Sequence, residues 1–416
     1  MQPFTLVFLA ALALTLSLRL WLAWRHIRHV QARRESVPAE FAAQISLEAH
    51  RKAADYSTAK TRLGILHALL ESALLLALTL GGGLGALSAL AAALPGGALW
   101  QGTFLILAVF LLIGAAELPL GLWHTFVIDQ RFGFNKTTPA LFLADLVKQL
   151  ALGAALGIPL VLGVLWLMEG MGENWWLYVW LAWMTFNLLM LAVYPNFIAP
   201  LFNRFTPLED DALKMRVESL LVACGFAAQG LYVMDGSRRT THGNAYFTGF
   251  GKARRIVFFD TLLARLSHDE ILAVLAHELG HFKHRHIIQR IVMIFAMSLA
   301  GLWLLGWLMG QAWFFGGLGV ATPGTAVALL LFLLASPVFT FPLQPLLSLH
   351  SRRQEFEADR YAARHADAGD LTRALVKLYN DNAATLTPDP LHSAFYDSHP
   401  PAAIRIAHLR GFAAQT

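Results

Sequence analysis

Two histidines and a glutamate are closely spaced in SHDEILAVLAHELGHFKHRH, residues 267–286. Ser267 and Glu270 have the spacing of a capping box, which predicts a helix that begins directly after Ser267. On that helix His277 and His281 are four residues apart, so both imidazoles project from one face at a separation that suits one tetrahedral metal ion. Glu278 then lies beside the ion without binding it. This is the H-E-x-x-H pattern of zinc proteases, in which the glutamate is the general base.

A catalytic zinc needs a third protein ligand and one position left open for water. The extended form of the motif would need glycine at position 284 and histidine at 287, where this chain has His284 and Ile287. The remaining candidate for the third ligand is a carboxylate from another helix. The segment SRRQEFEADRYAAR, residues 351–364, offers Glu355 and, one turn later on the same face, Asp359. We expect Glu355 to bind Zn²⁺ and Asp359 to accept the N–H of a ligating imidazole.

Other interpretations of these residues stay open at this point. Glu355 and Asp359 could belong to a solvated helix face paired with neighbouring arginines. Glu357 is expected to point away from the metal. His284 and His286 are expected at the surface or at an interface, because three ligands already complete a catalytic site.

The composition predicts that these elements are attached to a membrane. The chain is 56% hydrophobic and only 14% charged, and its mean hydropathy is +0.53, values outside the range of soluble domains. Runs long enough to cross about 30 Å of hydrocarbon as helices lie near 3–24, 64–94, 99–127, 140–167, 175–198, 289–310 and 324–349. The first run has its arginines after it, which favours a retained anchor over a cleaved signal.

The basic residues indicate the orientation of the seven spans. Lys and Arg follow spans one, three, five and seven, whereas 81–100, 168–174 and 311–323 carry neither. The positive-inside rule therefore predicts an outside N-terminus and a cytoplasmic C-terminus. The single cysteine, Cys224, excludes a disulfide framework and a thiolate cage. No clustered basic and aromatic pattern indicates nucleic acid, so the expected partners are the lipid bilayer and a peptide or protein substrate.

The predicted fold is an all-α-dominated integral membrane protein with a small cytoplasmic α+β domain built from two separated segments. Residues 1–198 hold spans one to five, 199–286 the first cytoplasmic segment, 287–349 spans six and seven, and 350–416 the second cytoplasmic segment. We expect a helix near 209–225, strands near 231–234, 244–248 and 254–259, and helices near 351–366 and 370–381. Residues 41–63 are expected to form a separate amphipathic surface helix. Ionisable residues within the spans, such as Glu71 and Asp145, could face a hydrated interior or pair with one another.

From about residue 40 onward the chain resembles the type I CAAX prenyl proteases, a family of integral-membrane zinc endopeptidases. The resemblance rests on a set of segments in matching order: FVIDQRFGFNKTTPALFLADLVKQ (126–149), PLFNRFTPLED (200–210), DGSRRTTHGNAYFTGFGKARRIVFFDTLL (235–263), EILAVLAHELGHFKHRH (270–286), SRRQEFEADRYA (351–362) and SHPPAAIRI (398–406). It implies seven helices that enclose a water-filled chamber, with the zinc site facing it from the cytoplasmic side.

The resemblance also implies roles for single residues. His277, His281 and Glu355 are similar to the family's zinc ligands and Glu278 to its general base. GNAYF resembles the strand that holds a peptide by backbone pairing, with Asn244 and Ala245 nearest the metal. His399 and Arg405 resemble residues that close the active site, His399 as a partner for the oxyanion or the substrate backbone.

The expected activity is zinc-dependent hydrolysis of peptide bonds near the C-terminus of prenylated CAAX-type or other membrane-associated peptides. One alternative with the same chemistry is a quality-control protease that cuts misfolded membrane proteins. An alternative of another class is a non-catalytic scaffold or transporter with a structural zinc. The short loops are typical of a bacterial protein, for which the inner membrane is expected; a eukaryotic chain would reside in the endoplasmic reticulum membrane.

Overall fold

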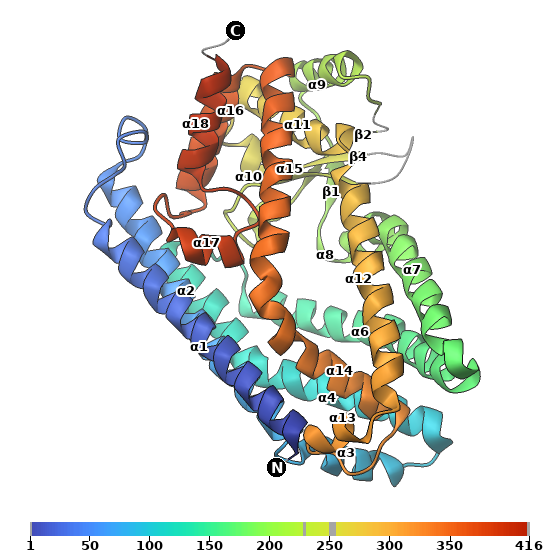
Figure 1. The fold of residues 1–416 in the computed structure, drawn as a ribbon. Helices are drawn as coiled ribbons and strands as arrows, with labels where there is room; N and C mark the ends of the chain where they lie inside the picture. Colours follow the sequence, from blue (N-terminus) through green and yellow to red (C-terminus); the bar gives the residue numbers. More distant parts are fainter. Residues whose placement is uncertain (1, 228–229, 249–254, 414–416) are drawn as a thin grey trace.

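The computed structural model describes residues 2–227, 230–248 and 255–413. Long helices form two inclined walls that meet at one end of the molecule, and a smaller domain of helices and a sheet covers the other end (Figure 1). Helix α1 (Pro3–Ala32) begins at the first end, and α18 (Ala402–Ala413) lies in the domain at the second (Figure 1). The N- and C-terminal helices are thus at opposite ends of the molecule.

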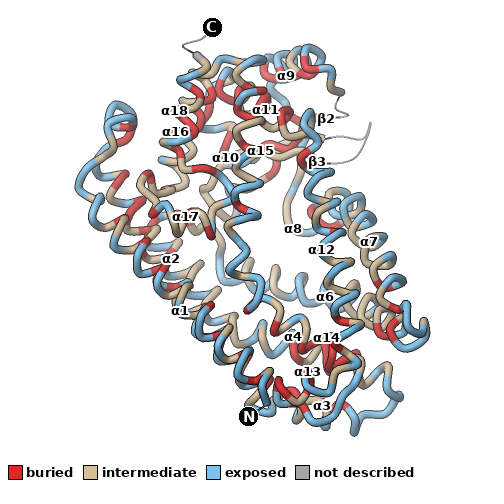
Figure 2. The backbone as a smooth tube through the Cα atoms, in the orientation of Figure 1, coloured by how far each residue is buried: buried red, intermediate tan, exposed pale blue. Residues whose placement is uncertain are grey.

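The described residues include seven helical stretches long and apolar enough to cross a membrane, which confirms the predicted number of spans. They are Pro3–Ala32, Leu47–Leu78, Gly97–Phe132, Pro139–Gly170, Gly172–Phe202, His286–Met309 and Thr325–His365. Many of their large apolar side chains point outward, such as Leu14 at 63% and Leu111 at 59% exposure. Figure 2 shows the long helices mostly exposed and the buried residues gathered at the two ends. Exposed apolar surface on this scale is what contact with lipid tails requires.

The helices of the membrane part have the following bounds. They are α1 (Pro3–Ala32), α2 (Leu47–Leu78), α3 (Gly83–Ala92), α4 (Gly97–Trp123), α5 (Gln130–Phe132), α6 (Pro139–Gly170), α7 (Trp175–Val193), α8 (Ala199–Phe202), α12 (His286–Met309), α13 (Ala312–Gly317) and α14 (Thr325–Thr340). Short π or 3₁₀ turns follow several of them: η1 (His124–Asp129), η2 (Gly172–Asn174), η3 (Tyr194–Ile198) and η5 (Phe341–Leu343).

Two predictions about the second span were wrong. The amphipathic segment 41–63 is not a separate surface helix, because α2 runs without interruption from Leu47 to Leu78. The apolar run 64–94 is not one helix, because the chain turns at Gly81–Gly83 and continues as α3. Gly82 has φ +77°, a left-handed conformation that favours glycine. Hydrophobicity continued across this turn, so it carried no signal of the break.

Two of the ionisable residues within the spans form ion pairs. Glu71 of α2 accepts a hydrogen bond from Arg19 of α1 at 2.6 Å. Asp145 of α6 binds Arg239, a residue of the segment beyond the membrane helices, at 2.9 Å. Such pairs reduce the cost of a charge in this layer. Ion pairs between elements therefore account for these charges.

A four-stranded sheet begins the domain beyond the membrane helices, in the order β1-β2-β4-β3. The strands are β1 (Phe205–Pro207), β2 (Gly230–Met234), β3 (Ala245–Thr248) and β4 (Arg255–Phe259). β1 and β2 are antiparallel, β2 and β4 parallel, and β3 and β4 antiparallel with Ala245 opposite Phe258. β3 therefore lies at an edge of the described sheet. Residue 254, expected in the last strand, lies outside the described residues.

The remaining helices of this domain come from both sides of the last two spans. They are α9 (Asp211–Ala223), α10 (Asp260–Leu263), α11 (His268–Lys283), α15 (Gln344–His365), α16 (Ala368–Asp381), α17 (Pro390–Tyr396) and α18 (Ala402–Ala413), with the 3₁₀ turn η4 (Gly236–Arg238). One apolar core joins Leu213 of α9, Leu275 and Leu279 of α11, Tyr361 of α15 and Ala374 of α16. The two polar segments thus pack together.

Helix α15 continues the last membrane helix. The helical stretch Thr325–His365 includes α14, the turn η5 and α15, with Pro337 inside α14. The span expected to end at 349 and the helix expected at 351–366 are therefore one rod, whose far end stands beside α11 (Figure 1).

Candidate metal centre

The N-cap of α11, Ser267, fixes where the helix begins and therefore which face carries each side chain. Ser267 accepts a hydrogen bond from the Glu270 N–H, and the Glu270 carboxylate accepts one from the Ser267 N–H at 2.8 Å. This confirms the predicted capping box. Lys377 of α16 also binds Glu270, at 2.7 Å. Burial raises the pKa of Glu270, but its bonds to Lys377 and Ser267 lower it overall, so this end of α11 is tied to α16.

Helices α11 and α15 pack closely where the two histidines lie. Gly280 stands between His277 and His281, and a Cβ added there would be 2.8 Å from the Cα of Ala358 on α15. Real Cβ atoms do not approach backbone that closely. Glycine at this position therefore lets the two backbones come together.

The close packing brings three side chains to one point. The Nε2 atoms of His277 and His281 are 3.2 Å apart. The carboxylate of Glu355 lies 3.5 Å from the first of these nitrogens and 3.3 Å from the second. His277 and Glu355 are buried, at 6% and 4% exposure. Among the described residues, these three form the group that could hold a metal ion.

Each imidazole has a hydrogen-bond partner at Nδ1, and its Nε2 atom faces the other imidazole and Glu355. Asp359 lies 2.9 Å from Nδ1 of His277, so this nitrogen carries the hydrogen that the carboxylate accepts. His286 lies 2.9 Å from Nδ1 of His281. If His281 donates there, both Nε2 atoms are acceptors. Two acceptors at 3.2 Å cannot bond each other, so they need a shared cation.

The three side chains fit zinc. Ligand bonds of 2.0–2.2 Å at tetrahedral angles place ligand atoms about 3.3 Å apart. The two imidazole nitrogens are 3.2 Å apart, and the Glu355 oxygens lie at similar distances from them, Oε1 3.3 Å from His281 and Oε2 3.5 Å from His277. Oε2 of Glu355 is buried and accepts no hydrogen bond. Its charged neighbour is Nη1 of Arg405 at 3.4 Å, so a metal ion would supply the direct partner that this oxygen lacks. Two imidazoles and a carboxylate are the ligand set of catalytic zinc.

The electrostatics at His277 also favour a cation. Burial lowers the pKa of this imidazole, but its hydrogen bonds to Asp359 and Glu355 raise the pKa to about 9 overall. Those carboxylates thus hold a positive charge at the ring, and a divalent ion at Nε2 would satisfy them in place of the second proton.

The contacts of His286 with His281 and Glu357 were missed in the sequence. His286 was expected at the surface or at an interface; it is 3% exposed and so lies at an interface, where Glu357 faces it with Oε2 2.9 Å from Nε2. Arg285, at φ +58°, turns the chain between α11 and α12 and so directs His286 back onto His281. A left-handed arginine has no sequence signal; the spacing of five residues from His281 was the only indication.

Glu278 lines a cavity of about 760 Å³ beside the three side chains. His399 lines it too, with Nε2 3.2 Å from Glu355 and Nδ1 3.0 Å from the Ser398 hydroxyl. Although 59% of the His399 side chain is exposed, it is surrounded by the cavity walls, and this burial within the protein lowers its pKa despite Glu355. The ring is therefore neutral at pH 7 and can donate one N–H into the cavity.

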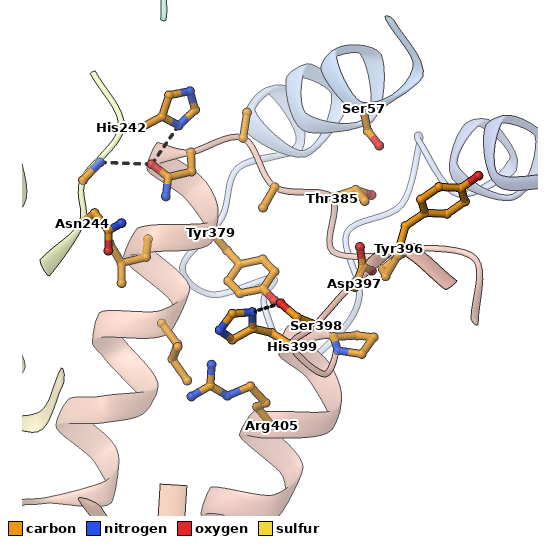
Figure 3. Close-up of a pocket in the computed structure, with 18 of the residues that line it drawn as sticks. Ser57, His242, Asn244, Tyr379, Thr385, Tyr396, Asp397, Ser398, His399 and Arg405 are labelled. Atoms are coloured by element: carbon orange, nitrogen blue, oxygen red, sulfur yellow. Dashed lines mark hydrogen bonds between the residues drawn. The ribbon is translucent and has the colours of Figure 1, made fainter. Parts of the chain in front are cut away.

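The other expected substrate residues also line this cavity, from two sides. Asn244 and Ala245 come from the start of β3, and Arg405 from α18 (Figure 3). Arg405 binds Asp359 with two nitrogens, at 2.9 and 2.5 Å, and is 5% exposed. Its Nη1 also lies 3.4 Å from Oε2 of Glu355. In this structure Arg405 therefore contacts the partner of His277 and Glu355 itself, and contact with a substrate stays a prediction.

Comparison with known proteins assigns both halves of the chain. Residues 26–204 match the family model described as CAAX prenyl protease N-terminal, five membrane helices. Residues 207–413 match the model of peptidase family M48.

Relatives and a solved structure agree with these matches. A CAAX prenyl protease 1 homolog of Arabidopsis thaliana is 39% identical over 71% of this chain and 70% of its own. The homolog of Caenorhabditis elegans is 32% identical over 98% of both chains. The crystal structure of S. mikatae Ste24p superposes with a TM-score of 0.90 at 30% identity, covering 98% of this chain and 99% of that one.

Proposed function

Because this chain belongs to peptidase family M48, with the N-terminal membrane region of the CAAX prenyl proteases, we propose that it hydrolyses peptide bonds near the C-terminus of prenylated CAAX-type proteins. It is an integral membrane metalloprotease. The observation that carries the proposal is the convergence of His277, His281 and Glu355 beside Glu278, in a cavity that reaches an edge strand. A structural zinc in a scaffold would have no use for the free carboxylate of Glu278.

His277, His281 and Glu355 would hold the zinc, which when bound supplies a Lewis acid that polarises the scissile carbonyl and acidifies water. Glu278 accepts the proton of the attacking water and passes it to the leaving amine. Asp359 and His286 keep the two imidazoles in the tautomer with Nε2 free. His399 donates an N–H to the developing oxyanion.

The edge strand β3 would hold the peptide by backbone pairing. The Asn244 carbonyl accepts from the N–H of Phe259 on β4, and because strand residues alternate in direction, the N–H and C=O of Ala245 face the open edge. The Asn244 side chain accepts from the Ala245 N–H at 2.8 Å. A peptide carbonyl would take that place.

Replacing Glu278 by Gln tests the mechanism. The variant keeps the shape of the side chain but removes the base, so we expect zinc content near that of the unaltered protein and a loss of about 10²–10⁴-fold in peptidase rate. Zinc would be measured by elemental analysis and the rate with a farnesylated C-terminal peptide. Cleavage at an undiminished rate would refute the role of Glu278.

The substrate class is tested separately. The unaltered protein should cleave a farnesylated peptide with a CAAX end faster than an unprenylated, unfolded membrane protein. The opposite preference would favour the quality-control activity, whose chemistry is the same.

We further propose that the metal centre faces the cytoplasm. The basic residues between spans five and six and after span seven support this orientation through the positive-inside rule. It would place the peptidase on the side where prenylated C-termini are exposed.

A further inference from the structure

The active-site cavity extends from the metal centre to α2. Its wall there consists of Tyr56, Ser57, Lys60 and Thr61, and the segment before β3 reaches it with His242 (Figure 3 labels Ser57 and His242). The ring of Phe134 lies 4.8 Å from that of Tyr56 and 4.7 Å from that of His242, so packed aromatic rings connect the two walls.

Lys60 is a cation without a carboxylate partner at this end of the cavity. Its Nζ lies 4.9 Å from the centre of the Tyr56 ring, and in the described part of the chain no carboxylate comes within the 4.0 Å of an ion pair. The other guanidinium or ammonium group that lines the cavity, that of Arg405, is bound by Asp359. Lys60 is therefore available to an anion from outside.

Among the described residues, the acidic groups near Lys60 do not form an ion pair with it. Asp129 accepts a hydrogen bond from the Tyr56 hydroxyl at 2.8 Å. Asp397 lines the cavity, and burial raises its pKa, against the effects of Ser393, Arg352, His399 and Lys60, the last of which acts from beyond ion-pair distance. A more readily protonated Asp397 repels an entering anion less. The ring nitrogen Nδ1 of His242 is bound by Asn382 at 3.1 Å.

The direction of the edge strand leads a bound peptide to this end. Antiparallel pairing is two to three times as common as parallel pairing. If a peptide pairs antiparallel to β3, the peptide residues that follow the scissile bond lie first beside Ala245, then beside Gly243 and then beside His242. The cavity is lined by residues 242–245 on that side. Three extended residues reach about 10 Å, and a CAAX end has three residues after its modified cysteine.

We propose that Lys60 binds the C-terminal carboxylate of the substrate, with Ser57 and Thr61 as neighbouring hydroxyl donors. This inference rests on the proposed peptidase function and specifies its substrate: a peptide whose free C-terminal carboxylate lies about three residues beyond the bond that is cut. The enzyme then recognises the end of a chain, and an internal site of the same sequence binds poorly.

The test compares two farnesylated peptides of one sequence, one ending in a free carboxylate and the other in an amide, with full-length zinc-loaded protein. The unaltered protein should cleave the peptide with the free carboxylate (the acid) with a kcat/KM about 10- to 100-fold higher than that for the peptide with the amide end, because one charge-assisted hydrogen bond has an effect of this size. Lys60→Met should bring the acid-to-amide ratio close to one, and Lys60→Arg should restore most of it.

Lys52→Met is the matched control. Lys52 lies two turns earlier on α2, where its Nζ is 4.7 Å from the Phe134 ring, and it does not line the cavity. Its variant should keep the acid-to-amide ratio of the unaltered protein. Equal cleavage of acid and amide by the unaltered protein, or a preference that survives in Lys60→Met, would overturn the inference while leaving the peptidase function intact. Failure to cleave either peptide would count against the function itself.

Discussion

At the scale of single residues, the two imidazoles of the centre are oriented in different ways. Asp359 holds His277 directly, whereas His286 holds His281 and is itself held by Glu357. One tautomer set satisfies the second chain: His281 donates to Nδ1 of His286, which donates from Nε2 to Glu357. Residues behind a metal ligand raise its basicity and restrict its rotation.

Loss of the His286 contact should weaken zinc binding. For His286→Phe we expect about 10–100-fold lower zinc affinity, because the aromatic ring keeps the volume but accepts no hydrogen from His281. Chelator competition would measure this without reference to activity. His284→Phe is the control, since His284 stacks on His286 but contacts neither imidazole of the centre within hydrogen-bond distance. Equal affinity of both variants would show that His286 does not orient His281.

Removal of Glu355 should have a larger effect. Glu355→Ala takes away the proposed third ligand and leaves two imidazoles, so purified protein should contain much less than one zinc per chain by elemental analysis. Glu278→Gln provides the comparison, because it alters a carboxylate in the same cavity that is not expected to bind the metal. An unchanged zinc content in Glu355→Ala would point to another ligand.

At the scale of helices and strands, the centre depends on how closely α11 approaches α15. In Gly280→Ala the added methyl group would meet Ala358 backbone at 2.8 Å, so the helices must separate. Overpacking costs about 1–3 kcal/mol, partly offset by about 1 kcal/mol of better helix propensity. The separation also moves Glu355 from the imidazoles. We expect a lower thermal unfolding midpoint together with loss of zinc.

Gly153→Ala is the control for this prediction. Gly153 lies inside α6 with nothing within 4 Å of an added Cβ, so its variant should keep zinc and be at least as stable. A Gly280→Ala protein as stable and as zinc-loaded as Gly153→Ala would show that the contact can relax freely.

Elements with strong local signals were predictable from the sequence. The capping box at Ser267 located the start of α11, and the spacing of Glu355 and Asp359 placed both on one face of α15. The missed features lacked a local signal. β1 has three residues and ends in Pro207, and its pairing partner β2 is more than twenty residues away. The continuation of the last span into a helix at 351–366 was missed because the composition changes from apolar to charged near residue 350, whereas α15 runs through this point without a break.

At the scale of the whole molecule, the proposed orientation can be tested by labelling. On a Cys224→Ser background, Glu173→Cys places an exposed thiol between spans four and five and Glu209→Cys one beyond span five. A membrane-impermeant thiol reagent should label the first on intact cells and the second only after permeabilisation. The reverse pattern would place the metal centre outside the cell or in the lumen.

The split of the centre between α11 and the far end of the α14–α15 rod has a consequence for biosynthesis. His277 and His281 leave the ribosome 78 and 74 residues before Glu355, and the last two membrane crossings, α12 and α14, lie in between. A nascent chain therefore has the proposed general base and two of the proposed ligands long before it has the third. Proteolysis can begin only when translation and membrane insertion of that final rod are complete, so the enzyme is silent during its own synthesis without needing a propeptide.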